Sequence, residues 1–216
     1  MTVVFDGIAS GMLLFLIAVG LSVTLGLMNF VNLAHGAFAM FGGYVCVVAS
    51  GRWGIPFLPA VVLAALATAA LGALLERLLF RRLYGASQLD QVLFSIGLVF
   101  VAMAIARWGF GPAQQPIRLP AWLQGQVHLG GLDIGVYRAF LVVLGLAVAY
   151  GLHRAIGVTR LGARLRASVD KPDVARGMGI DVDRVFVVTF ALGSGLAGLG
   201  GAVGVELLGL DPSFPL

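Results

Sequence analysis

Four polar residues stand in stretches that are otherwise apolar, and they mark where this sequence could act on a solute inside a bilayer. Asn29, Asn32 and His35 fall within one short segment, Asn-Phe-Val-Asn-Leu-Ala-His-Gly. Glu206 is the single acid that follows a run of 21 uncharged residues. Polar and ionisable side chains are costly in membrane segments and commonly belong to solute or ion pathways. We therefore take these four residues as candidates for lining a pathway or bracing its gate.

Each of these candidates also has a structural interpretation. Asn32 and His35 are three residues apart, so a helical segment would place them on one face. A break in a membrane helix frees backbone groups that need partners, and these side chains could bond to that backbone or cap the break. Glu206 falls near the outer end of the last predicted span, where it could simply reach water.

The sequence carries no set of residues that predicts catalysis. No metal-ligand cluster, pair of acids or nucleophile beside a base occurs in the apolar stretches, so we expect no enzyme activity, no metal and no cofactor. The single cysteine, Cys46, excludes an internal disulfide framework. The phosphate-binding pattern G-x-x-x-x-G-K-S/T is absent, so ATP hydrolysis would have to take place on another chain.

Composition places the chain in a membrane. Of its 216 residues, 60% are hydrophobic and only 11% are charged, and the mean hydropathy is +1.01. Soluble domains have about 25% charged residues. The pI of 9.8 comes from arginines in loops and not from a nucleic-acid-binding face. We predict an all-α polytopic membrane protein in which residues 1–216 form a single transmembrane domain.

About six transmembrane helices fit the apolar pattern, since one span needs about 20 residues. The predicted spans are residues 8–28, 37–50, 53–75, 92–110, 137–156 and 185–208. The segment between the first two spans is interpreted as a broken or re-entrant helix, with a simple turn as the alternative. Residues 127–134 alternate around Gly130-Gly131 and predict a β-hairpin. In the last span, Gly193, Gly198 and Gly201 predict close helix packing.

Residues 153–184 form the one long polar segment between apolar spans, and they hold seven of the 14 basic residues. Those seven are Arg154, Arg160, Arg164, Arg166, Lys171, Arg176 and Arg184. A second basic cluster, Arg77, Arg81 and Arg82, brings the two segments to ten of the 14. Loops rich in lysine and arginine face the cytoplasm. This bias predicts that residues 153–184 are cytoplasmic and that the N-terminus lies outside.

The pattern within this loop predicts a folded segment. Apolar residues recur at every fourth position, at Leu161, Leu165 and Val169. This spacing predicts a short amphipathic helix lying on the membrane surface. Pro172 suits the first position of a second helix, Gly179 suits a position past its end, and Asp181 or Asp183 would cap the last span. An ordinary loop that binds lipid headgroups is the alternative.

Several runs of residues are similar to those of a known family of membrane proteins. The longer runs are Thr159-Arg-Leu-Gly-Ala-Arg-Leu-Arg-Ala-Ser, Val174-Ala-Arg-Gly-Met-Gly-Ile-Asp-Val-Asp-Arg-Val and Phe190-Ala-Leu-Gly-Ser-Gly-Leu-Ala-Gly-Leu-Gly-Gly-Ala. Near the N-terminus they are Met28-Asn-Phe-Val-Asn-Leu-Ala-His-Gly and Gly42-Gly-Tyr. Taken together and in this order, they resemble the branched-chain amino-acid type permeases of ABC importers. The resemblance covers residues 7–216 and is specific to the family, not to one solute.

The resemblance implies a set of partners and a docking site. It implies pairing with a second permease subunit in a bacterial inner membrane, with ATP-binding subunits on one side and a periplasmic solute-binding protein on the other. Beyond the lipid bilayer and these proteins, no nucleic-acid partner is implied. The short helix at residues 172–179 would be the coupling helix that the ATP-binding subunits grip. The ATPase-coupling residues in the matching stretch are Arg164, Arg166, Asp170, Pro172, Gly177, Gly179 and Asp181.

Other functions remain open at the level of sequence. An importer subunit for urea, amides or sugars would carry the same loop. A self-sufficient channel or secondary carrier would instead rely on His35 and Glu206. Family members continue into further spans past the stretch that matches Asp-Pro-Ser-Phe-Pro-Leu at residues 211–216, so we expect this chain to be a truncated permease.

Overall fold

The computed structural model describes every residue except 1, 29, 31, 118, 130–131 and 216. Its helices are α1 (Thr2–Met28), α2 (His35–Gly51), α3 (Phe57–Leu78), α4 (Gln88–Phe110), α5 (Val136–Gly157), α6 (Arg160–Asp170), α7 (Pro172–Gly177) and α8 (Val182–Leu208). Two short turns, η1 (Phe80–Leu83) and η2 (Ala121–Leu123), and two strands, β1 (Gln126–Leu129) and β2 (Leu132–Gly135), complete the described elements.

The all-α polytopic prediction is confirmed. Within the described part of the chain, five helices are long and apolar enough to cross a bilayer: α1, α3, α4, α5 and α8. The second predicted span is the shorter helix α2, whose 17 residues fall below the roughly 20 that a full crossing needs. It begins at His35, within the polar segment that predicted the break, two residues before the predicted start at residue 37.

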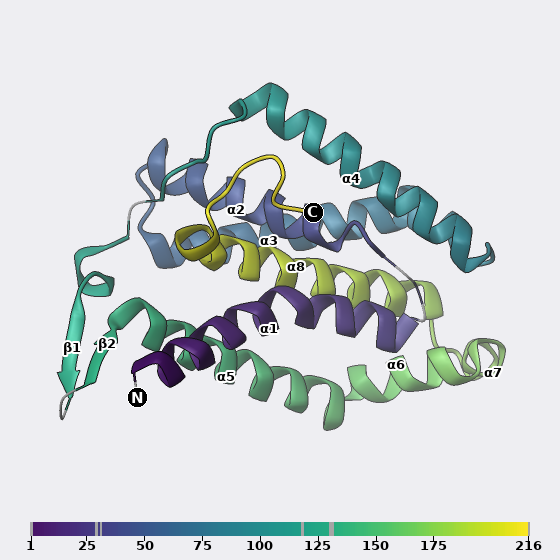
Figure 1. Cartoon of the computed structure of the whole chain (residues 1–216). Coiled ribbons are helices and arrows are strands. Elements are labelled where there is room, and N and C mark those ends of the chain that lie inside the picture. Colours follow the sequence, from purple (N-terminus) through teal and green to yellow (C-terminus); the bar gives the residue numbers. More distant parts are fainter. Residues whose placement is uncertain (1, 29, 31, 118, 130–131, 216) are drawn as a thin grey trace.

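Helix α8 lies at the centre of the bundle (Figure 1). Its neighbours are α1, α2 and α3, and α5 packs along the outer side of α1. Helix α4 contacts mainly α2 and leaves large apolar side chains exposed along most of its length. Because α8 is the most buried of the five long helices, the packing around it determines where its two ends lie.

Small residues permit this close approach. A Cβ added at Gly201 would collide with the backbone of Ala39 in α2, and one at Gly198 would collide with the Thr68 side chain in α3. Gly193 faces Thr24 and the backbone of Gly20 in α1 in the same way. Such contacts replace the hydrophobic effect as the basis of helix association in lipid.

The bundle has two distinct ends (Figure 1). At the hairpin end, β1 and β2 pair antiparallel, with Val127 opposite Ile134 and Leu129 opposite Leu132. This confirms the predicted hairpin, although its central Gly130-Gly131 lies outside the described residues. At the opposite end, which we call the loop end, α6 and α7 lie beside the first turn of α8 and near η1.

Adding one methyl group at the centre of the bundle tests this packing. We expect Gly201→Ala to lower the thermal unfolding midpoint in detergent, because overpacking a tight interface costs about 1 to 3 kcal/mol. Gly97→Ala in α4 is the matched control, since nothing lies within 4 Å of a Cβ at that position. Equal midpoints for the two variants would contradict the close packing of α8 against α2.

Candidate functional site

The segment from α6 to the start of α8 is folded by caps that its own residues supply. The Thr159 hydroxyl accepts a hydrogen bond from the Gly162 amide at 3.3 Å, and Pro172 occupies the first turn of α7. Of the two acids proposed to cap the last span, Asp181 does so, accepting from the Arg184 amide at 3.0 Å. The predicted order of helix, short helix, turn and span is observed.

Most of the residues in this segment face outward. Arg164 and Asp170 of α6 are exposed, while Arg166 donates from Nη1 to the Ile156 carbonyl at 2.6 Å and so ties α6 to the end of α5. Within α7 only Ala175 is buried. Gly177 has open space around its Cα, which leaves this side of α7 free of contacts within the chain.

A turn and two apolar side chains shape the rest of this surface. Gly179 has φ +81°, a left-handed conformation that a side chain would strain. Val174 and Met178 are 55% and 77% exposed on either side of Ala175. We call residues 160–181 the coupling surface, after the role that the sequence analysis predicts for them.

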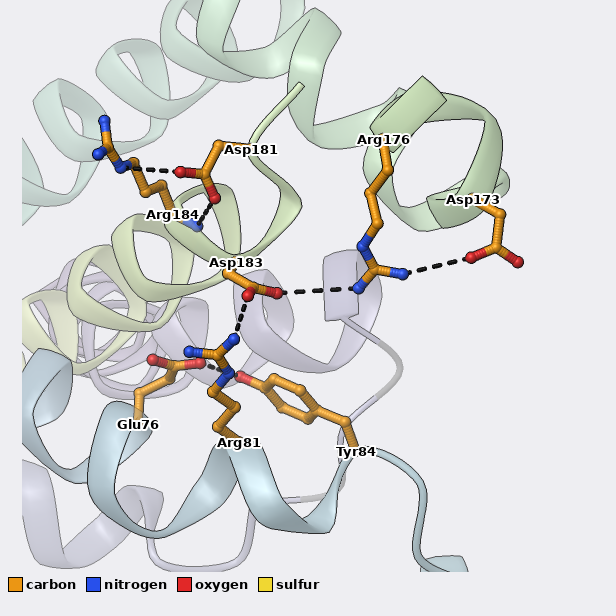
Figure 2. Close-up of polar contacts among 8 residues, drawn as sticks. All are labelled: Glu76, Arg81, Tyr84, Asp173, Arg176, Asp181, Asp183 and Arg184. Atoms are coloured by element: carbon orange, nitrogen blue, oxygen red, sulfur yellow. Dashed lines mark hydrogen bonds and ion pairs between the residues drawn. The ribbon is translucent and has the colours of Figure 1, made fainter. Parts of the chain in front are cut away.

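A chain of ion pairs links the coupling surface to the spans (Figure 2). The Asp183 carboxylate pairs through Oδ2 with Arg81, and its Oδ1 lies 3.8 Å from Nη2 of Arg176. Arg176 in turn pairs with Asp173 at 3.3 Å. These side chains are half-exposed or more, so each pair adds only about 0 to 1 kcal/mol to stability. The elements that these ion pairs connect are therefore more informative about function than the small stability that they add.

A cavity of about 570 Å³ lies beneath this chain of ion pairs. It is bounded by the end of α1, the η1 region, α4, α6, α7 and α8. Its polar lining residues are Arg81, Tyr84, Gln91, Asp173, Arg176 and Asp183. Helix α7 thus lies across open space from the η1 region and the start of α4, and the ion pairs connect the two sides.

A buried acid next to this cavity was not recognised from the sequence. Glu76, at the end of α3, is 1% exposed, and its Oε1 accepts a hydrogen bond from the Tyr84 hydroxyl at 2.7 Å. Burial, together with this bond to Glu76, raises the pKa of Tyr84. The second carboxylate oxygen has no hydrogen-bond partner among the described residues. In the sequence Glu76 lies close to arginines, a pattern that indicates a helix end facing water. This pattern gives no sign that Glu76 is buried.

The polar residues at the helix break bond to the backbone. Asn32 Oδ1 accepts from the Ala34 amide at 3.0 Å, and His35 Nε2 lies 2.8 Å from the Ile17 carbonyl, an arrangement that requires this nitrogen to donate. Both side chains are buried. The third member of the proposed group, Asn29, lies outside the described residues. The break is therefore anchored to α1.

Glu206 does not lie near Asn32 and His35. It is exposed near the C-terminal end of α8, whereas His35 lies close to Gly20 and Gly193. The 13 residues from Gly193 to Glu206 span about 20 Å of helix at 1.5 Å per residue. Among the described residues, no group of three or more His, Cys, Asp and Glu side chains could hold a metal ion.

The fold and this surface define a multi-pass α-helical membrane protein with a structured loop at one end of its bundle. Residues 3–213 match the family model described as branched-chain amino acid transport system / permease component. Because the match covers nearly the whole chain, the chain belongs to this family and is a multi-pass inner-membrane transport subunit.

Named relatives carry similar descriptions. The chain is 29% identical to the high-affinity branched-chain amino acid transport system permease protein BraD of Pseudomonas aeruginosa, over 95% of this chain and 69% of that protein. It is 26% identical to LivH of Escherichia coli K12, over 92% and 68% of the two chains. It is 28% identical to a probable LivH of Methanocaldococcus jannaschii, over 88% and 62%. No solved structure matches significantly.

The bond between Tyr84 and Glu76 yields a prediction about stability. Tyr84→Phe leaves a buried carboxylate oxygen without its donor, which costs about 1 to 3 kcal/mol, so the thermal midpoint in detergent should fall. Tyr150→Phe is the control, because Tyr150 is 67% exposed. If both variants unfold at the wild-type temperature, the hydrogen bond is not a stabilising element of the loop end.

Proposed function

We propose that this permease subunit of an ATP-binding-cassette importer translocates branched-chain amino acids or related small polar solutes, driven by ATP hydrolysis on separate subunits. The observation that carries the proposal is the family match over residues 3–213, which includes the whole coupling surface. The names of BraD and LivH describe branched-chain amino acid transport, and identity of 25 to 29% over most of the chain supports a related solute here.

The loop end faces the cytoplasm in this proposal, and the N-terminus is periplasmic. The two segments that hold ten of the 14 basic residues, around Arg81 and at residues 153–184, lie at this same end. The ion pair between Arg81 and Asp183 joins them directly. Positive charge concentrated at one end of a bundle favours the cytoplasmic side.

The ATP-binding subunits dock on the coupling surface. Helix α7 suits this role because its exposed Val174 and Met178 offer apolar contact area on a short, projecting element. The proposed coupling residues belong to the same segment: Arg164, Arg166, Asp170, Pro172, Gly177, Gly179 and Asp181. Closure of the ATP-binding subunits would move α7 and shift the spans between outward-open and inward-open states.

The remaining partners follow from the same architecture. A second permease subunit pairs with this one in the bilayer, and a periplasmic solute-binding protein delivers the solute at the hairpin end. Exposed apolar side chains along α4 and α5 are available for lipid or for the second permease subunit. Asn32, His35 and Glu206, with Asn29, are proposed to act at the pathway or its gate, the first two by holding the break that starts α2.

Bulk added to α7 tests the docking assignment. Gly177→Leu should abolish co-purification of the ATP-binding subunits, because Gly177 is exposed and nothing else in the described chain lies within 4 Å of a Cβ at that position. Gly157→Leu at the end of α5 is the matched control, since Gly157 is equally exposed and lies outside the coupling surface.

The result also separates the proposed function from a self-sufficient carrier. If the Gly177→Leu variant still retained the ATP-binding subunits, the assignment of α7 to the docking site would be wrong. Solute uptake into proteoliposomes by the permease without ATP-binding subunits would contradict the proposal that ATP hydrolysis on separate subunits drives transport.

A further inference from the structure

Helix α7 packs against α6 and the start of α8, and Ala175 is its one buried residue. The cavity of about 570 Å³ separates α7 from the η1 region, which follows α3, and from the start of α4. Close-packed side chains transmit displacement because they leave no free volume between them. The cavity beside α7 is open space and cannot transmit displacement in this way. Any direct link from α7 to α3 must therefore cross the cavity by electrostatic attraction.

Asp183 is the point where that link converges (Figure 2). Its carboxylate is shared between two guanidinium groups, with Arg81 at Oδ2 and Arg176 at Oδ1. Arg81 follows the end of α3, Arg176 belongs to α7, and Asp183 itself lies in the first turn of α8. One side chain thus joins the element that meets the ATP-binding subunits to the ends of two spans.

We propose that Asp183 is the positioning residue that transmits displacement of α7 to α3 and α8, an inference that rests on the proposed function. At 3.8 Å the Arg176 contact is the looser of the two, so it is the one that a shift of α7 makes or breaks. Coulomb attraction changes steeply at such short range. When Arg176 approaches or leaves Asp183, the strength of the ion pair between Asp183 and Arg81 changes. The end of α3, which precedes Arg81, is then drawn toward α8 or released from it.

A neighbouring ion pair offers a control, because it has the same chemistry but does not connect α7 to the η1 region. Arg184 pairs with Asp181 at 2.8 Å at the start of α8, and among the described residues no ion pair joins Arg184 to another element. The Arg184 side chain is 83% exposed. Loss of the Arg184 charge therefore removes an ion pair from the same helix turn without touching the route from α7 to α3.

The experiment uses the full transporter, with permease subunits, ATP-binding subunits and solute-binding protein, in proteoliposomes supplied with radiolabelled leucine. The measured quantity is leucine transported per ATP hydrolysed, together with the amount of ATP-binding subunit that co-purifies. For Asp183→Asn we expect normal co-purification but a fall in leucine per ATP of about fivefold or more, the lower range of allosteric coupling. Asp183→Glu should restore most of the ratio, and Arg184→Gln should leave it unchanged.

A double-variant comparison distinguishes transmission from a local defect. If Asp183 and Arg81 act in one route, Asp183→Asn combined with Arg81→Gln should be no worse than Asp183→Asn alone. An unchanged ratio for Asp183→Asn, or additive losses in the double variant, would overturn the proposal. Loss of ATP-binding subunits from Asp183→Asn would make Asp183 part of the docking site and would also overturn it. Failure of the wild-type transporter to take up leucine would instead count against the proposed function.

Discussion

The structure depends on how closely α8 approaches α1, α2 and α3. Gly193, Gly198 and Gly201 place α8 backbone where an added methyl group would collide with a neighbour. In lipid, no hydrophobic effect draws helices together, so backbone proximity and dispersion must supply the association. Once α8 is fixed in this way, its first turn becomes a rigid point at the loop end, and both α7 and the η1 region are positioned relative to it.

The two ends of α8 then serve different purposes. At the hairpin end it carries the exposed Glu206, while at the loop end Asp181 caps it and Asp183 meets the two arginines. The half-exposed ion pairs add little to stability, whereas the glycine contacts determine the fold. This division lets the loop end rearrange without unfolding the bundle, as the proposed drive by a separate ATPase requires.

The sequence was sufficient for elements that depend on local pattern. Apolar runs located the spans, Pro172 and Gly179 located the ends of α7, and Asp181 or Asp183 was expected to cap the last span, because caps and hydropathy act within a few residues. The pairing of Arg81 with Asp183 joins residues 102 positions apart, and no local pattern specifies it. Glu76 is buried because Tyr84 folds back over it, which depends on the η1 turn. The predicted element at residues 37–50 agrees closely with α2 (His35–Gly51), but it was counted as a full span, and its 17 residues are short for a crossing.

The central claim is that α7 projects into the cytoplasm and is covered by ATP-binding subunits. The most direct measurement is labelling of a Met178→Cys variant with a membrane-impermeant maleimide, because Met178 is 77% exposed and the native Cys46 is fully buried. We expect labelling in inside-out vesicles, none in right-side-out vesicles, and protection once the ATP-binding subunits are assembled. Labelling from the outer side, or labelling that assembly leaves unchanged, would contradict the account.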